Sequence, residues 1–210
     1  MTSRQRTDLR FVAFEGPDGV GKTTQIQLLA DHLRSQGLVV VVTREPGGTA
    51  VGEQIREVLV RASQLGVESE LLLLLAARLE HLRLLILPAL RRGEVVLTDR
   101  YSGSTLAYQG VTRGLGIEFV LRISAMFEDL IEPDLTIYLD AEHPQRDFRF
   151  DRHDQFEREG IEKWRTVRDA YRLCAERFQW RVVSAEGARA RIAEEIARFV
   201  DARFVLDSEA

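Results

Sequence analysis

One eight-residue stretch restricts the possible folds of this chain more than any other feature: Gly16-Pro17-Asp18-Gly19-Val20-Gly21-Lys22-Thr23. An apolar run over residues 10–14 comes before it, and the segment from Thr24 to Ala30 is typical of the start of a helix. A strand, a G-x-x-x-x-G-K-[ST] turn and a helix in this order are typical of a phosphate-binding loop. The alternative is a glycine-rich turn with an incidental lysine.

Lysine usage favours the functional interpretation. The chain has 29 basic residues, but only Lys22 and Lys163 are lysines. A preference for arginine across the chain does not explain why a compact ammonium group stands inside this turn, since a planar guanidinium would fit it differently.

The residue types of the turn suit the binding of a nucleoside triphosphate. Glycines allow the backbone to wrap around an anion, and the N–H groups at the start of the following helix then face the phosphates. We expect Lys22 to reach the β- and γ-phosphates and the Thr23 hydroxyl to take one position on Mg²⁺. The residues expected to hold the phosphates of a nucleotide are Gly16, Pro17, Asp18, Gly19, Val20, Gly21, Lys22, Thr23 and Thr24.

Composition narrows the class of protein. With 210 residues, the chain is long enough for one α/β domain with a proper core, and a net charge of −4 argues against a nucleic-acid-binding surface. The single Cys174 excludes an intramolecular disulfide and fits a reducing compartment. We read it as a buried helix residue and not as a nucleophile. The polar N-terminus lacks the apolar core of a signal peptide, and charged residues interrupt the apolar stretch Leu71–Leu90, so that it is not a membrane span. We therefore expect a cytoplasmic protein.

Apolar runs and helical periodicity alternate along the chain. Strands are expected at residues 10–14, 38–43, 94–98, 134–139 and 181–184, and helices at 22–35, about 50–62, 69–91, 102–109, 117–130, 162–178 and 188–204. The arginine- and aspartate-rich residues 143–160 are predicted to form a mobile loop. This order predicts a single domain over residues 1–210, a three-layer α/β/α sandwich around a parallel sheet.

Charged side chains follow the predicted strands directly. Arg44 follows one strand and Asp99-Arg100 follows another, while Arg78 interrupts an apolar helix face. Ligands of parallel sheets bind beyond the carboxyl ends of the strands, where these residues and the glycine-rich turn would meet. Arginine suits bidentate capture of phosphate, and Asp99 stands where an acid can assist Mg²⁺. For Arg78, a salt-bridged structural role is an equal alternative.

Several blocks together resemble bacterial thymidylate kinases, a family of P-loop nucleoside monophosphate kinases. They are the segment from Glu15 to Thr23, the segment from Thr43 to Thr49, Asp99-Arg100-Tyr101, Ala107-Tyr108-Gln109-Gly110 and the segment from Pro133 to Asp140. The blocks occur in the family's order and at similar spacing, and the resemblance extends from Phe11 to about Phe204. It implies phosphorylation of thymidine monophosphate by ATP with Mg²⁺, in a homodimer. The absence of asparagine removes the N-K-x-D element of a GTPase.

The resemblance also implies roles for individual residues. Lys22, Arg100, Asp18 and a lid arginine such as Arg152 would be catalytic, and Thr23 and Asp99 would serve the metal. Arg44 and Arg100 would hold the acceptor phosphate, Asp18 the sugar and Arg78 the thymine edge. Ser104, Thr105 and Gln109 would lie nearby, and Tyr108 would crowd the 2′ position of the sugar. Glu45-Pro46 is a candidate for a cis peptide bond.

Two departures from the family pattern bear on specificity and turnover. Leu74 stands where the family usually stacks a phenylalanine on thymine, so the pocket keeps an apolar floor but loses an aromatic face. The lid looks shortened, which leaves open whether Arg146, Arg149, Arg152 or Arg158 contacts ATP. Alternatives are therefore a kinase of the same fold for another nucleoside monophosphate, or a nucleotide-binding homologue without turnover.

Overall fold

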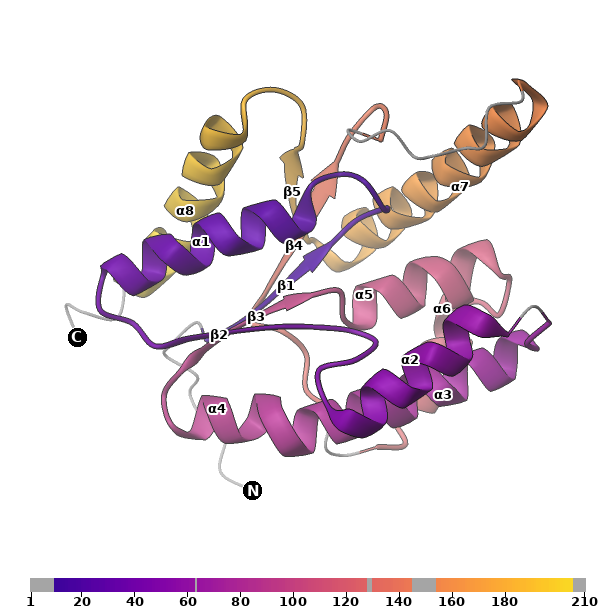
Figure 1. Ribbon diagram of the computed structural model, residues 1–210, viewed down its shortest axis with the longest axis horizontal. Helices are drawn as coiled ribbons and strands as arrows, with labels where there is room; N and C mark the ends of the chain where they lie inside the picture. The colour runs from indigo at the N-terminus through magenta and orange to yellow at the C-terminus, as the bar shows by residue number, and fades with distance from the viewer. Residues whose placement is uncertain (1–9, 63, 128–129, 145–153, 206–210) are drawn as a thin grey trace.

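The computed structural model describes residues 10–62, 64–127, 130–144 and 154–205, and within the last range the side chains of 160–202. Its centre is a parallel sheet in the order β2-β3-β1-β4-β5 with helices on both faces, as Figure 1 shows. The strands are β1 (Phe11–Glu15), β2 (Val40–Arg44), β3 (Val95–Asp99), β4 (Leu135–Asp140) and β5 (Arg181–Ser184). The predicted three-layer α/β/α arrangement around a parallel sheet is confirmed.

The central strand β1 shows how the sheet separates two apolar layers. Its side chains point alternately to the two faces, and all five residues are buried. Val12 and Phe14 pack with the helices α1 (Lys22–Ser35) and α8 (Arg189–Val205). Phe11 and Ala13 pack on the opposite face, against the region that follows helix α3 (Val67–His81). A strand buried on both faces accounts for the uninterrupted apolar run in the sequence.

The register of the strands brings the predicted functional residues to one edge of the sheet. Phe14 of β1 pairs with Asp99 of β3, and Arg44 of β2 pairs with the same residue from the other side. The glycine-rich turn follows β1 at this edge, and α1 begins directly after it. The carboxyl ends of β1, β2 and β3 therefore form one wall of a common site.

Five more helices pack around the sheet and against one another. They are α2 (Ala50–Arg61), α5 (Ser102–Thr105), η2 (Leu106–Thr112), α6 (Ile117–Ser124) and α7 (Asp154–Phe178). Helix α2 packs on α3, and α7 packs on η2 and β4 (Figure 1). Within the described ranges, no helix is long and apolar enough to cross a membrane.

The predicted long helix 69–91 differs from the observed one. Helix α3 already begins at Val67, and a π-helical turn, η1 (Leu82–Ile86), separates it from α4 (Leu87–Arg91). The physical reason is Pro88, which has no N–H to donate four residues back and whose ring would crowd that carbonyl. The N–H of Leu87 donates instead to the carbonyl of Leu82, five residues earlier. The predicted helix 102–109 likewise continues as a π-helix to Thr112.

Two further boundaries predicted from the sequence were wrong. The helix expected at 117–130 ends at Ser124. The expected loop 143–160 is wrong in its last part, because α7 begins at Asp154 and includes Gly160. Charged residues such as Glu157 and Arg158 made this segment resemble a loop, yet Glu, Gln and Arg are good helix formers. Residues 145–153, with Arg146, Arg149 and Arg152, lie outside the described residues, as does the side chain of Arg158.

Candidate functional site

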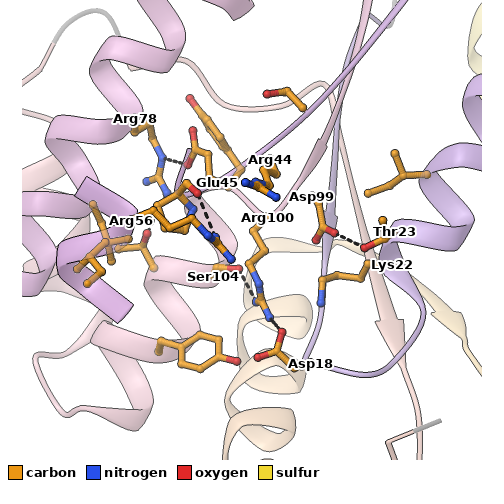
Figure 2. A pocket seen from close by; sticks show the side chains of 18 of the residues that line it. Asp18, Lys22, Thr23, Arg44, Glu45, Arg56, Arg78, Asp99, Arg100 and Ser104 are labelled. Carbon is orange, nitrogen blue, oxygen red and sulfur yellow. Dashed lines mark hydrogen bonds and ion pairs between the residues drawn. The ribbon is translucent and has the colours of Figure 1, made fainter. Parts of the chain in front are cut away.

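A cavity of about 760 Å³ lies beyond the carboxyl ends of β1, β2 and β3. Its lining brings together residues that are far apart in the sequence, and Figure 2 shows many of them. The predicted site residues in the lining are Asp18, Gly19, Gly21, Lys22, Thr23, Thr24, Arg44, Leu74, Arg78, Asp99, Arg100, Ser104, Thr105, Tyr108 and Gln109. Most of the residues predicted for the phosphate-binding turn and for the arginine-rich pocket thus share one space, whereas Gly16, Pro17 and Val20 of the turn are not part of the lining.

The glycine-rich turn has the backbone conformation that its sequence predicts. Gly16, Gly19 and Gly21 all have positive φ, at 141°, 84° and 91°. A side chain at Gly16 would also place its Cβ only 2.7 Å from the carbonyl oxygen of Leu139 on β4. Glycine is therefore required at this position both for its φ and for the close approach of a neighbouring strand.

Lys22 folds back over this turn. Its Nζ donates hydrogen bonds of 2.9 Å to the carbonyl oxygens of Gly16 and Pro17. Burial of the side chain and the nearby positive charge of Arg100 lower the pKa of Lys22 to about 8. The two carbonyls hold the ammonium group at the loop, where it can exchange them for the stronger charge of phosphate oxygens.

Thr23 and Asp99 meet at the start of α1. The Thr23 hydroxyl donates to Asp99 Oδ2 at 2.9 Å. Among the residues that the structure describes, no group of three or more His, Cys, Asp or Glu could hold a metal ion. Magnesium at nucleotide sites needs only one or two protein ligands, because phosphates and water supply the others. Two hard oxygen donors at this position fit such an ion.

Asp18 and Arg100 join the two halves of the cavity. Arg100 Nη2 donates to Asp18 Oδ1 at 2.6 Å, and Nη1 donates to Ser104 Oγ at 3.0 Å (Figure 2). Partial burial opposes ionisation of Asp18, but Arg100 and Lys22 outweigh it and lower the pKa of this carboxyl. The indole Nε1 of Trp164 on α7 donates to the backbone oxygen of Asp18 at 2.9 Å, which ties the turn to that helix.

A buried ion pair forms the far wall of the cavity. Arg78 Nε donates to Glu45 Oε2 at 2.7 Å, and Nη2 donates to the Thr105 hydroxyl at 2.9 Å. His81 Nδ1 lies 3.0 Å from Glu45 Oε1, and its Nε2 lies 2.7 Å from Thr43 Oγ1. Arg78 is therefore held from two sides in a salt-bridged geometry at the cavity wall. The Glu45-Pro46 peptide bond is cis, as its sequence allowed.

Gln109 is held by a carboxylate of helix α3. Its Nε2 donates to Glu70 Oε1 at 2.9 Å, and Glu70 also pairs with Arg113 at 2.7 Å. Because the amide nitrogen is engaged, the oxygen of Gln109 is left as the hydrogen-bond acceptor of this side chain. Leu74 lies on the same helix as Glu70 and Arg78 and lines the cavity.

Two arginines at the mouth of the cavity are held less firmly than the buried Arg78. Arg44 is exposed and pairs with Glu53 at 3.0 Å. Arg56 of α2 donates to the carbonyl oxygen of Pro46 at 3.1 Å and lines the same cavity (Figure 2). An exposed arginine exchanges partners at low cost, so Arg44 is available to an incoming anion, and the partly buried Arg56 lies beside the same space with a neutral carbonyl as its partner.

Sequence reasoning missed several of these residues. Arg56 belongs to a polar helix, where an arginine is unremarkable, although its position shortly after the turn 44–49 was a usable signal. Glu45 was noted only for its proline bond. Tyr171 of α7, whose hydroxyl accepts from Arg100 at 2.6 Å, carries no sequence signal at all, since only packing brings α7 beside Arg100.

The fold and the cavity define a P-loop protein of the nucleoside monophosphate kinase type, with a triphosphate cradle facing an arginine-lined pocket. Comparison with known proteins agrees. The family model described as "Thymidylate kinase" matches residues 14–196. A thymidylate kinase of Pelotomaculum thermopropionicum is 46% identical over 85% of this chain and 87% of its own length. One from Nitrosospira multiformis is 43% identical over 82% of this chain and 86% of its own.

Structural comparison gives the same result. The crystal structure of thymidylate kinase from Ehrlichia chaffeensis superimposes with a TM-score of 0.75 at 31% identity, covering 91% of this chain and 98% of that one. This chain belongs to the thymidylate kinase family.

Proposed function

We propose that this protein transfers the γ-phosphoryl group of ATP to thymidine monophosphate and forms thymidine diphosphate. One observation carries the proposal: the glycine-rich turn and the acceptor-side arginine lie in one cavity, joined by the 2.6 Å contact between Asp18 and Arg100. Two phosphates bound at these two places would be close enough to react in line. Family membership supports the same reaction.

The donor half of the site would be the turn and the start of α1. Backbone N–H groups of residues 16–24 would hold the triphosphate, and Lys22 would turn from its two carbonyl partners to the β- and γ-phosphates. Thr23 and Asp99 would hold Mg²⁺, which neutralises charge on the phosphates when it is bound. Arg152 in the lid stays a candidate for contact with the transferred phosphate.

The acceptor half would be the arginine-lined wall. Arg100, with Arg44 and Arg56 at the mouth, would bind the acceptor phosphate. Arg78 and the oxygen of Gln109 would face the polar edge of thymine, with Ser104 and Thr105 nearby and Leu74 under the ring. The N3–H of thymine is a donor and matches the Gln109 acceptor. Asp18 would accept from the sugar hydroxyl, and Tyr108 would disfavour a 2′-hydroxyl.

This arrangement needs no dedicated general base. A phosphate monoester is already largely dianionic near neutral pH, so its oxygen can attack without losing a further proton. What the protein must supply is alignment and compensation of the charge that spreads over the transferred group. Lys22 on the donor side and Arg100 on the acceptor side would supply the positive charge that this compensation needs.

Assembly and location belong to the same proposal. We infer a homodimer, supported by exposed apolar side chains on adjacent helices: Val58 of α2 is 50% exposed and Leu72 of α3 is 58% exposed. Light scattering coupled to size-exclusion chromatography measures this directly. We also infer that the enzyme is cytoplasmic, because that compartment contains nucleotide substrates and keeps a thiol such as Cys174 reduced. The chain would form a single domain over residues 1–210 with a lid at about 143–160.

The test is turnover with purified protein. Incubation with ATP, Mg²⁺ and each deoxynucleoside monophosphate should yield the diphosphate of thymidylate at the highest kcat/KM. Arg100→Ala should reduce that value by about a hundredfold or more, with little change in ATP affinity. Brisk activity on another monophosphate with none on thymidylate would overturn the substrate assignment, and nucleotide binding without any turnover would overturn the enzyme assignment.

A further inference from the structure

Glu15, the last residue of β1, is an acidic side chain buried completely beneath the glycine-rich turn. Its Oε1 accepts the backbone N–H of Tyr101 at 2.8 Å. Its Oε2 accepts the hydroxyl of Ser104 at 2.6 Å and lies 3.4 Å from the hydroxyl of Tyr171. Burying a carboxylate is costly, so its retention here calls for a reason beyond packing.

The two hydroxyl groups beside Glu15 both accept from Nη1 of Arg100, whereas Nη2 of the same guanidinium is held by Asp18. Arg100 Nη1 donates to Ser104 Oγ at 3.0 Å and to Tyr171 OH at 2.6 Å, and the two hydroxyls lie 2.7 Å apart. Each hydroxyl has one proton and two lone pairs. When Ser104 donates to Glu15 and Tyr171 donates to Ser104 or Glu15, both present lone pairs to the guanidinium. Glu15 therefore sets the direction of the whole network.

Glu15 also fixes the backbone at Arg100. Arg100 has a φ of 73°, which is uncommon for a residue with a side chain. This conformation is held by the Arg100 N–H, which donates to Phe14 O at 2.9 Å, and by the next N–H, of Tyr101, which donates to Glu15. The strand end of β1 thus controls both the backbone and the guanidinium of Arg100.

We propose that Glu15 is a positioning residue that aims the Arg100 guanidinium at the acceptor phosphate through Ser104 and Tyr171. The inference rests on the proposed function in one respect, that Arg100 binds that phosphate. Space is tight around the carboxylate, because a Cβ on Gly103 would lie 2.8 Å from Glu15 Cδ. The side chain is therefore held in one place and can act as a fixed reference for the network.

The electrostatic surroundings of Glu15 set the pH range of this role, because the ionised form, which accepts at both oxygens, predominates only above about pH 7. Burial raises the pKa of Glu15 to about 7, against the opposing effects of the Ser104 hydrogen bond, the Arg100 charge and the Tyr101 N–H. Other titratable groups that interact with it are Lys22, Tyr108, Tyr171 and Cys174. Arg100 is the cation that its side-chain network reaches directly.

The decisive variant is Glu15→Gln, which keeps the size of the side chain and removes its charge. The amide must place an NH₂ group against either the Tyr101 N–H or the Ser104 hydroxyl, so the proton order of the network cannot be kept. We expect the Kd for thymidine monophosphate, measured by isothermal titration calorimetry at about pH 8, where Glu15 is mostly ionised, to rise about tenfold. The Kd for thymidine, which lacks the phosphate, and the Kd for a non-hydrolysable ATP analogue should change by less than about twofold.

A matched pair of tyrosines separates positioning from loss of packing. Tyr171→Phe removes the network hydroxyl, while Tyr138→Phe removes another buried phenol hydroxyl, which bonds Asp140, from a ring stacked 5.6 Å away. Tyr171→Phe should weaken thymidine monophosphate selectively, as Glu15→Gln does, and Tyr138→Phe should not. The double variant Glu15→Gln/Tyr171→Phe should lose less than the sum of the two, because both act through Arg100.

The outcomes are distinct. Equal weakening of thymidine and thymidine monophosphate in Glu15→Gln, or unchanged affinity for both, would overturn the positioning role while wild-type turnover still supports the proposed function. Additive effects of the two network variants would also overturn it. Failure of the wild-type protein to bind or phosphorylate thymidine monophosphate would instead refute the proposed function. If Glu15→Gln does not fold, Tyr171→Phe against Tyr138→Phe decides the question.

Discussion

Substitution of Glu45 by glutamine tests how the wall of the acceptor pocket is held. Glu45 is 5% exposed and Arg78 is 4% exposed, and the carboxylate contacts both Arg78 and His81. Glutamine keeps the shape but removes the negative charge, which leaves the Arg78 guanidinium buried with the Thr105 hydroxyl as a neutral partner. Breaking a buried ion pair from one side costs about 3–5 kcal/mol, and we expect the lower end because the glutamine oxygen still accepts a hydrogen bond.

The expected loss of about 3 kcal/mol lowers the unfolding midpoint by roughly 6–12 °C for a protein of this size. Differential scanning calorimetry and urea titration measure it, with Glu57→Gln as the control because Glu57 forms an exposed pair with Arg61 at 3.7 Å. A loss of stability below about 1 kcal/mol would contradict this prediction, because it would mean that the Glu45–Arg78 pair contributes no more than a solvent-exposed salt bridge. The double variant Glu45→Leu/Arg78→Met should recover most of the stability and still fail to bind thymidine monophosphate.

Three further predictions concern titration and base contact. Because the pKa of Lys22 is lowered to about 8 in the free protein, kcat/KM for ATP should fall above about pH 8. The value of kcat should fall only at higher pH, because bound phosphates favour the charged form of Lys22. A kcat/KM that stays constant up to about pH 9.5 would contradict this prediction. The raised pKa of Glu15, about 7, means that its folded-state stabilisation is complete below about pH 4.5 and is lost as pH rises through 7. Urea titrations should therefore show the stability of wild type falling relative to Glu15→Gln by on the order of 3 kcal/mol between pH 4.5 and 8, and a constant difference would contradict it. Leu74→Phe should tighten thymidine monophosphate by about 1 kcal/mol through ring stacking, measured by calorimetry; equal or weaker affinity would show that another side chain already covers the base.

The sequence alone determined the features that depend on short stretches of chain. The spacing of Gly16, Gly21 and Lys22 after an apolar run requires a strand, a positive-φ turn and a helix in that order. Alternating apolar runs and periodic segments require a parallel sheet with helices on both faces. Since parallel strands end at a common edge, the polar residues after β2 and β3 had to face the glycine-rich turn. The cavity and most of its lining could therefore be predicted without coordinates.

Predictions from local sequence patterns were wrong where two sequence preferences within one segment oppose each other. At Pro88 the apolar periodicity continues, but the missing N–H forces a π-helical turn. At residues 154–160 the charge density resembled a loop, while the helix propensity of Glu, Gln and Arg and the packing of the rest of α7 extended the helix. Neither outcome can be read from periodicity alone.

Only the tertiary structure decided which residues hold the arginines in place. Glu15, Tyr171 and Trp164 come from two elements far apart in the sequence, and they reach Arg100 and Asp18 because α7 packs beside the end of β1. Likewise Glu45 became the partner of Arg78 and His81 through the approach of α3 to the turn after β2. Such contacts depend on side-chain directions that are fixed by packing over the whole core, and they cannot be predicted from the spacing of residues in the sequence.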